Sequence, residues 1–221
     1  MSKVNKERKG CRDVFHAYFV EDAEFEGKLE IPYIDRENEI PERLISFTDA
    51  LRTEDFDQWV HFYEDDSGFE RIWNRPNYYL PQLKKFNGVI TPDFSLYRDM
   101  PLVMQQWNTY RGKALGYWWQ TQGLEVIPNV RTADKRSLPF SCYGVPHGSP
   151  ICMGIHGCVR IREERELFKA GLLYVIKRVR PSHIIFYGAV PKDILEICSA
   201  RNVCFLQFPS EFALSRKRVI V

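Results

Sequence analysis

The chain has 221 residues, of which 44% are hydrophobic, 27% are charged and 14% are aromatic. This length suits one domain with a substantial core, and the aromatic content excludes a largely disordered chain, because so much aromatic surface must be buried. No apolar run approaches the roughly 18 residues of a membrane span, and the basic start leads into no signal-peptide core. We therefore expect a cytoplasmic protein with no membrane partner.

The net charge of +2 hides an uneven distribution along the chain. Residues 21–70 contain 17 acidic and 4 basic side chains, whereas residues 71–221 carry a net charge of +12. We interpret residues 1–12 as a basic N-terminus that frays, and residues 13–221 as a single domain with an acidic N-terminal part. Two explanations of the charge are open: the two halves attract each other within one fold, or the acidic part meets a basic partner.

In chain order, Phe15–Val20 predicts a first strand, and the acidic stretch Glu21–Glu42 predicts irregular structure. Short apolar runs then recur, and most are separated by segments long enough for a helix. Continuous apolar runs indicate strands that are buried on both faces, hence a parallel sheet covered by helices. The seven further strands predicted in this way are Leu44–Phe47, Trp59–Tyr63, Gly88–Ile90, Leu124–Ile127, Ile151–Ile155, His183–Tyr187 and Val203–Phe208.

Three helices are predicted between these runs. The first begins after Asp99, a residue typical of helix N-caps, and ends at Gly123. The second covers Arg162–Val179, and the third runs from Pro191 to Ala200. The first helix is expected to bury a stripe spaced by three and four residues, made of Val103, Trp107, Tyr110, Ala114, Tyr117 and Trp118.

This order of elements predicts an α/β fold with a mainly parallel sheet of βα units flanked by helices. Two architectures fit the pattern: an open three-layer sheet, or else an incomplete TIM-like barrel. Both architectures place a binding site at the carboxyl ends of the strands.

Several long strings of the sequence are similar to one known family. They are QWVHFY (58–63), FERIW (69–73), GVITPDFSLYRDMP (88–101), WNTYRGKALGYW (107–118), VIPNVR (126–131), GIHGC (154–158) and IFYG (185–188). Through them the chain resembles the domain-of-unknown-function family numbered 4417, whose members come from bacteria, phages and plasmids. The resemblance implies no reaction. It favours nucleic-acid or nucleotide handling by association alone.

Polar residues follow several predicted strands at their carboxyl ends, which lie at one edge of a parallel sheet. Binding and catalytic residues are often found in the loops at such strand ends. The motifs of the common enzyme classes, such as a Walker A loop or a G-x-S-x-G elbow, are absent. We expect one ligand-binding rim, with Arg111 turned toward it from the first helix. Its predicted members are Asp93, Ser95, Arg111, Asn129, Arg131, Gly154, His156, Gly157, Cys158 and Tyr187.

Catalytic candidates within this rim are Asp93, His156 and Cys158. Asp93 and His156 are candidate general acid–base groups, because aspartate and histidine side chains donate and accept protons. Cys158 is a candidate nucleophile with His156 as its base. The turn Gly154–Cys158 either directs backbone N–H groups at a phosphate or is a tight turn that needs glycine. The irregular spacing of cysteine and histidine predicts no metal site, the six cysteines are interpreted as thiols, and no cofactor is predicted.

Three functions stay open. The first is a nucleic-acid- or nucleotide-binding protein of the mobile-element type, with a ligand phosphate near Arg131 and the Gly154–Cys158 turn. The second is a phosphoester hydrolase or related enzyme that uses Asp93 and His156. The third is a protein-interaction module whose acidic segment, residues 21–70, binds a basic protein partner. A basic concave rim favours the first function, a buried ionisable cluster the second and an exposed acidic stripe the third.

Overall fold

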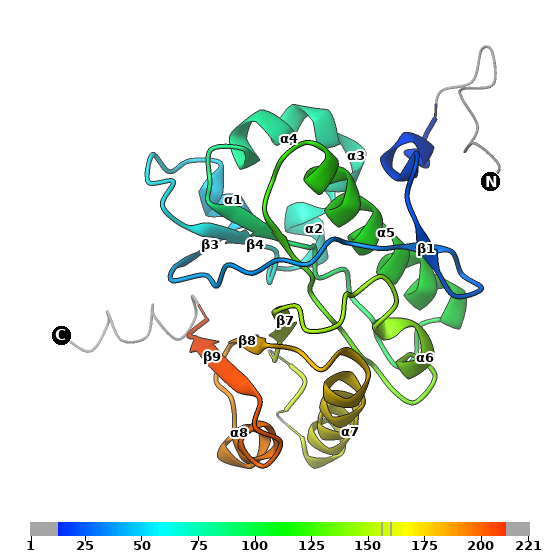
Figure 1. Cartoon of the computed structure of the whole chain (residues 1–221), viewed down its shortest axis with the longest axis vertical. Helices are drawn as coiled ribbons and strands as arrows, with labels where there is room; N and C mark the ends of the chain where they lie inside the picture. The colour runs from blue at the N-terminus through cyan, green and yellow to red at the C-terminus, as the bar shows by residue number, and fades with distance from the viewer. Residues whose placement is uncertain (1–12, 156, 160, 211–221) are drawn as a thin grey trace.

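The structure is a computed structural model that describes residues 13–155, 157–159 and 161–210. The expected fraying of residues 1–12 and the expected role of His156 lie outside the described residues. Parallel strands occupy the middle of the molecule, with α1, α3, α4 and α5 on one side and α7 and α8 on the other (Figure 1). The helices are α1 (Phe47–Ala50), α2 (Asp66–Phe69), α3 (Arg71–Asn74), α4 (Pro76–Leu83), α5 (Leu102–Thr121), α6 (Leu138–Ser141), α7 (Arg162–Val179) and α8 (Lys192–Ser199).

Seven strands pair in the parallel direction and follow one another in sequence order. They are β3 (Leu44–Ser46), β4 (Trp59–His61), β5 (Gly88–Ile90), β6 (Val126–Ile127), β7 (Ile151–Gly154), β8 (His183–Tyr187) and β9 (Cys204–Phe208). The first four form one sheet and the last three another. A parallel bridge between Asn129 and Cys152 joins the two sheets just beyond β6. The predicted α/β fold with a mainly parallel sheet is confirmed.

Side chains alternate between an outer and an inner face along the strands, and β4–β8 are buried on both faces, whereas the edge strand β9 is partly exposed. In the segment that contains β4, Val60 and Phe62 belong to the cluster beneath α5, where the Phe62 ring stacks on Trp119 with 5.7 Å between ring centroids. A second outer cluster lies beneath α7 and α8. The inner faces share one cluster that draws on every strand: Trp59, Ile90, Ile127, Cys152 and Ile185 are buried in it, and Leu44, Leu206 and Phe208 pack against it.

This shared inner cluster favours the incomplete barrel over the open three-layer sheet. In an open sheet the strands have no inner side on which all of them meet, whereas inward side chains from successive strands fill the middle of a barrel. Among the described residues the barrel does not close, because β3 and β9 each pair with one strand only.

Two predictions near the N-terminus were wrong or incomplete. Phe15–Val20 is not a strand: it ends in the 3₁₀ helix η1 (Ala17–Val20). The Asp13 carboxylate accepts the backbone N–H groups of Phe15 and Ala17 at 3.0 and 2.6 Å, which starts a turn instead of an extended segment. The irregular acidic stretch that follows contains one short antiparallel pair, β1 (Phe25–Glu26) with β2 (Ile31–Pro32).

The predicted buried stripe of α5 is wrong in its first two turns, and the helix begins at Leu102 with Pro101 as N-cap. Val103 and Trp107 are 68% and 37% exposed. Polar side chains are buried there because they bind the loop after β5. Gln105 Nε2 donates to the Tyr97 carbonyl at 3.0 Å, and Asn108 Nδ2 donates to the Ser95 carbonyl at 2.7 Å.

The acidic and basic parts of the chain contact each other within the fold. Glu26 forms an ion pair with Arg178, and Glu70 forms one with Arg111. Part of the charge asymmetry is therefore neutralised internally. Within the described part of the chain, no helix has the length and apolar character needed to cross a bilayer.

The contact between Gly88 and Trp59 gives a test of the inner cluster. A Cβ atom on Gly88 would lie 2.4 Å from Cζ3 of the Trp59 ring, so Gly88→Ala must displace that ring. We expect a loss of about 1–3 kcal/mol in the free energy of unfolding, measured by urea denaturation.

Gly68→Ala is the matched control, because its Cβ would meet only Thr48 Oγ1, at 3.9 Å. It should change the free energy of unfolding by less than about 1 kcal/mol, in the stabilising direction. Equal effects of the two substitutions would contradict the proposed packing of the inner cluster.

Candidate functional site

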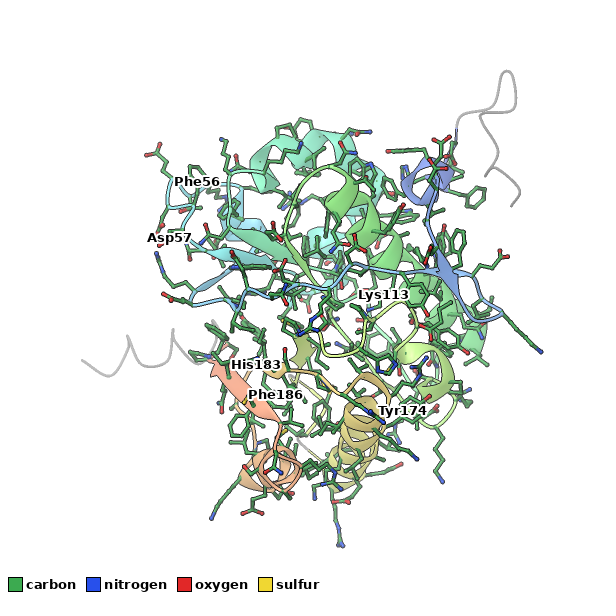
Figure 2. The ribbon with its side chains drawn as sticks, in the orientation of Figure 1. Phe56, Asp57, Lys113, Tyr174, His183 and Phe186 are labelled. Carbon is green, nitrogen blue, oxygen red and sulfur yellow. The ribbon has the colours of Figure 1, made fainter. Side chains whose placement is uncertain are left out.

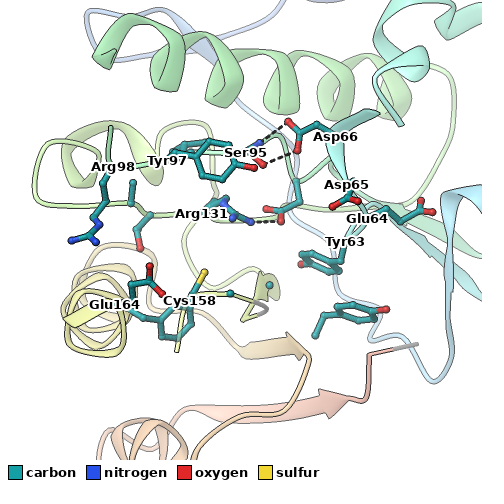
Figure 3. A pocket seen from close by; sticks show the side chains of 18 of the residues that line it. Tyr63, Glu64, Asp65, Asp66, Ser95, Tyr97, Arg98, Arg131, Cys158 and Glu164 are labelled. Atoms are coloured by element: carbon teal, nitrogen blue, oxygen red, sulfur yellow. Dashed lines mark hydrogen bonds and ion pairs between the residues drawn. The ribbon is translucent and has the colours of Figure 1, made fainter. Parts of the chain in front are cut away.

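A pocket of about 1230 Å³ lies at the carboxyl ends of the strands (Figure 3). Its wall is built from the ends of β4, β5, β7 and β8, from the loop after β5 and from the first turns of α2 and α7. Parallel strands place their carboxyl ends at one edge, so side chains that are far apart in sequence meet there.

Asp93 is the centre of the polar network in this pocket and is 8% exposed. Its Oδ2 forms an ion pair with Arg131. Its Oδ1 accepts a hydrogen bond of 2.7 Å from Asn129 Nδ2. The Tyr63 hydroxyl in turn donates to Asn129 Oδ1 at 2.9 Å, so side chains from the ends of β4, β5 and β6 are joined in one chain of hydrogen bonds.

Burial raises the pKa of the Asp93 carboxyl, while the Arg131 cation and the Asn129 amide act in the opposite direction. The balance leaves the pKa of Asp93 above its ordinary value. Burial also raises the pKa of the Tyr63 hydroxyl well above its ordinary value, so this group stays protonated and acts as a donor. The network therefore places a carboxyl with a raised pKa, Asp93, at the wall of the pocket.

Asn129 is held from behind by helix α5 and strand β5. Lys113, which is 3% exposed, donates from Nζ to the Asn129 carbonyl at 2.7 Å, and the Thr91 hydroxyl accepts the Asn129 backbone N–H at 2.8 Å. Figure 2 places Lys113 in the middle of the molecule, on the long helix α5. Burial lowers the pKa of the Lys113 ammonium to about 8.

Aromatic rings form the part of the pocket wall that faces β8. The rings of Tyr63 and Tyr187 stack with centroids 4.8 Å apart and planes inclined by 14°. The His61 ring lies beneath them, 4.3 Å from Tyr187. Burial lowers the pKa of His61 to about 3, so this imidazole is neutral at physiological pH.

Most of the predicted rim residues are brought together. Those that line the pocket are Asp93, Ser95, Arg131, Gly154, Gly157, Cys158 and Tyr187, and Asn129 lies directly behind Asp93. His156 lies outside the described residues, so its pairing with Asp93 or Cys158 stays a prediction. Burial raises the pKa of the Cys158 thiol, which disfavours the thiolate that a nucleophile requires.

Arg111 does not line the pocket. Its guanidinium forms an ion pair with Glu70, donates to Asn108 Oδ1 at 2.7 Å and lies 3.9 Å from the centroid of the Phe94 ring. These contacts hold the loop after β5 against α5, so the role of Arg111 is structural.

The described residues of the Gly154–Cys158 turn show one committed donor at Cys158 and close packing at Gly154. The Cys158 N–H donates to the Ile155 carbonyl at 3.1 Å, so this group is not directed at a ligand. A Cβ on Gly154 would lie 2.7 Å from Cδ1 of Tyr63 and 3.4 Å from Oδ2 of Asp93, so only glycine fits there. This geometry favours the interpretation of the turn as a glycine requirement over the phosphate loop.

The basic concave rim that would favour the first function is not found among the described residues. Of these residues, two with guanidinium groups, Arg98 and Arg131, line the pocket. They are outnumbered by the carboxylates of Glu64, Asp65, Asp66, Asp93, Asp99 and Glu164. Among the described residues, no three side chains of His, Cys, Asp or Glu are grouped so that they can hold a metal ion.

Tyr63 and the acidic residues that follow it were missed by the sequence analysis. The signal was available, because Tyr63 ends one of the predicted strands and Glu64–Asp66 follow it directly, as Asp93 follows β5. Asp66 is engaged in the site: its carboxylate accepts from Ser95 Oγ at 2.7 Å and from the Ser95 N–H at 3.1 Å. Lys113 carries no comparable signal, because a lysine within a helix usually faces solvent.

Comparison with known proteins identifies the family. The model of a family described as a domain of unknown function, DUF4417, matches residues 23–209. The chain belongs to this family. The match includes every strand of the incomplete barrel and the described pocket up to β9, so the architecture and the site are features of the family region.

Two curated relatives are phage proteins. The Gene 1 protein of Mycobacterium phage D29 is 34% identical over 161 residues, which cover 72% of this chain and 58% of the relative. The Gene 1 protein of Mycobacterium phage L5 is 37% identical over 129 residues, which cover 58% of this chain and 56% of the relative. The chain thus spans less than two thirds of the length of either relative. No solved structure matches the chain.

Arg131→Met tests the buried ion pair. Without the cation the pKa of Asp93 in the folded state rises further above its unfolded value. A carboxyl of this kind contributes stability below the unfolded pKa, and that contribution is lost as the pH rises through the folded pKa. We expect the variant to lose ~3 kcal/mol in the free energy of unfolding at pH 7 and clearly less near pH 4.

Arg98→Met is the control, because Arg98 and its partner Glu163 are both exposed. Its loss should stay below about 1 kcal/mol at both pH values. Urea denaturation measures all three proteins, and an equal loss for Arg131→Met at both pH values would contradict the assignment of the effect to Asp93.

Lys113→Met tests the buried ammonium through pH. The pKa of Lys113 is about 8 in the folded protein and about 10.4 in an unfolded chain. Between these values the unfolded chain binds the extra proton, so the free energy of unfolding rises with pH. Wild type should therefore gain stability relative to Lys113→Met between about pH 8 and pH 10. A difference between the two proteins that stays constant with pH would contradict this assignment.

Proposed function

We propose that the pocket is the active site of an enzyme that acts on a small molecule, with Asp93 as its acid–base group. The observation that supports this best is Asp93 itself: a carboxyl that is largely buried, borders a large cavity and has a pKa above its ordinary value. Groups of this kind cluster at sites that transfer protons. Of the three functions considered from the sequence, a buried ionisable cluster favours the second, a phosphoester hydrolase or related enzyme.

The contacts of Asp93 define its part in a hydrolysis. The ionised carboxylate accepts a proton from a water molecule while the water oxygen bonds to the electrophilic atom of the substrate. The proton then passes from Asp93 to the leaving group, whose bond to that atom breaks. Arg131 and Asn129 hold both carboxylate oxygens in place through these steps, and Arg131 stabilises the ionised form that begins and ends the cycle.

The wall of the pocket favours a substrate with a flat ring, such as a nucleoside. Tyr63, Tyr97 and Tyr187 line it, and tyrosine rings stack on bases irrespective of their sequence. A carboxylate that lines the pocket, here Asp93, also accepts hydrogen bonds from the amino groups on base edges. This narrows the nucleotide hypothesis to a small ligand held by its ring.

Binding of a nucleic-acid strand is the second candidate, and it rests on the +12 charge of residues 71–221. The acidic lining of the pocket opposes it there, so strand binding needs basic groups elsewhere on the surface. Fluorescence anisotropy with labelled single- and double-stranded DNA and with RNA at about 50 mM salt tests it, since phosphate contacts are strongest at low salt. No change in anisotropy at this salt would remove strand binding.

Asp93→Asn tests the enzyme proposal. Wild type is incubated with a panel of nucleosides, nucleotides and cyclic dinucleotides, and products are detected by mass spectrometry. We expect turnover of at least one compound, and a rate reduced by about 100-fold or more in Asp93→Asn, the range of general acid–base catalysis. The rate in wild type should fall as the pH drops through the pKa of Asp93, because the protonated carboxyl cannot accept a proton.

Asp55→Asn is the matched control, because Asp55 is an exposed carboxylate that pairs with Arg43 and does not line the pocket. It should keep the wild-type rate. Turnover that survives in Asp93→Asn would remove Asp93 as the acid–base group, and a panel on which wild type has no activity would count against a nucleotide-type substrate.

A further inference from the structure

We propose that the ligand of this pocket carries a positive charge, as an amine or guanidinium group on a small organic molecule. The chemistry of Asp93 on the bound molecule rests on the proposed function. The binding of a cation to the pocket does not depend on it. The inference names the class of substrate that the pocket selects.

The first argument is the charge that remains after internal pairing. Both guanidinium groups of the wall are committed to carboxylates: Arg131 pairs with Asp93, and Arg98 pairs with Glu163 at 2.5 Å. Among the described lining residues, no cation is without a carboxylate partner. The described wall therefore carries a net negative charge, which attracts cations and repels phosphates.

The second argument is that, in the described part of the chain, five of the six wall carboxylates form no ion pair, and three of these five accept no hydrogen bond either. Asp66 and Glu64 accept hydrogen bonds from Ser95 and from the Thr48 N–H. The remaining carboxylates come from three different segments: the N-cap of α2, the loop after β5 and the first turn of α7. Within the described residues, no ion pair is found for these three, Asp65, Asp99 and Glu164.

The third argument is the aromatic wall, which is independent of the carboxylates. Tyr63 and Tyr97 line the same cavity, and Figure 3 shows Tyr97 beside Arg98 and Tyr63 beside Glu64 and Asp65. In the described part of the chain, the cation–π contacts involve other rings, so no internal cation covers these two. An organic cation is attracted by carboxylates and by ring faces together.

An inorganic cation fits this wall less well. A small metal ion needs several oxygen ligands at one point, and the described residues contain no group of three ligating side chains that could hold one. The charges are instead spread around a cavity of about 1230 Å³. This spacing suits a molecule with one or more ammonium groups on an extended frame.

Isothermal titration with spermidine at about 50 mM salt tests the proposal, since screening is weak there. The pocket variant Asp65→Asn/Asp99→Asn/Glu164→Gln removes the three wall carboxylates that have neither an ion pair nor a hydrogen bond among the described residues. We expect wild type to bind spermidine, and the pocket variant to bind it about tenfold or more weakly, because three partly exposed charge contacts are lost. ATP should not compete.

The control variant Glu21→Gln/Glu54→Gln/Glu196→Gln makes the same change in net charge at exposed positions outside the pocket. It should bind spermidine as wild type does. Equal weakening in both variants would show attraction by overall charge and would overturn the proposal, as would the absence of binding to wild type. Displacement of spermidine by ATP, lost in Arg131→Met, would instead identify the ligand as an anion.

The outcome is separable from that of the proposed function. If a neutral nucleoside is turned over in an Asp93-dependent way while spermidine does not bind, the charge inference fails alone. If spermidine binds through the three pocket carboxylates while turnover of the panel does not depend on Asp93, the acid–base proposal fails alone.

Discussion

Two sheets of parallel strands pack their inner faces against each other, and the geometry of the pocket depends on this contact. The two faces are closely packed, because the Trp59 ring is buried in the inner cluster and only glycine fits against that ring at position 88. A parallel bridge between Asn129 and Cys152 also joins the two sheets. The strand ends above this point are therefore held at fixed distances, although the barrel is open between β3 and β9.

A buried charge at the strand ends then constrains its surroundings. Asp93 loses most of its hydration on folding, and an unpaired carboxylate in that position is strongly destabilising. Arg131 supplies the opposite charge, and Asn129 and Tyr63 extend the hydrogen bonds to neighbouring strands. Lys113 fixes the backbone from which Asn129 projects. The site is thus positioned by buried groups that are held by hydrogen bonds from several strands.

The outer part of the pocket differs from the surroundings of Asp93 in the elements that supply its side chains and in their exposure. Its side chains come from loops and from the first turns of helices, and they are more exposed than those around Asp93. Among the described residues, most carboxylates there form no ion pair, so they contribute less to the stability of the fold than the pair at Asp93. The pocket thus combines a hydrogen-bonded interior around one carboxyl with an acidic entrance.

Local sequence determined much of the architecture. The seven parallel strands were predicted from continuous apolar runs, since strands buried on both faces need apolar side chains at every position. Helix α7 was predicted at Arg162–Val179 and has these bounds, because its periodicity and its terminal charges agree. The position of Asp93, Asn129 and Arg131 at strand ends was also available from the sequence, and this placed them on one rim.

Tertiary structure alone decided which partners these residues found. From the sequence, Arg131 was a candidate phosphate ligand or the partner of an acid, and only the fold shows that its partner is Asp93. Val103 and Trp107 were predicted to be buried, yet α5 turns its polar side toward the loop after β5, whose carbonyls need donors. The inner cluster, the buried Lys113 and the acidic entrance depend on contacts between segments far apart in the chain, and a local pattern carries no information about such contacts.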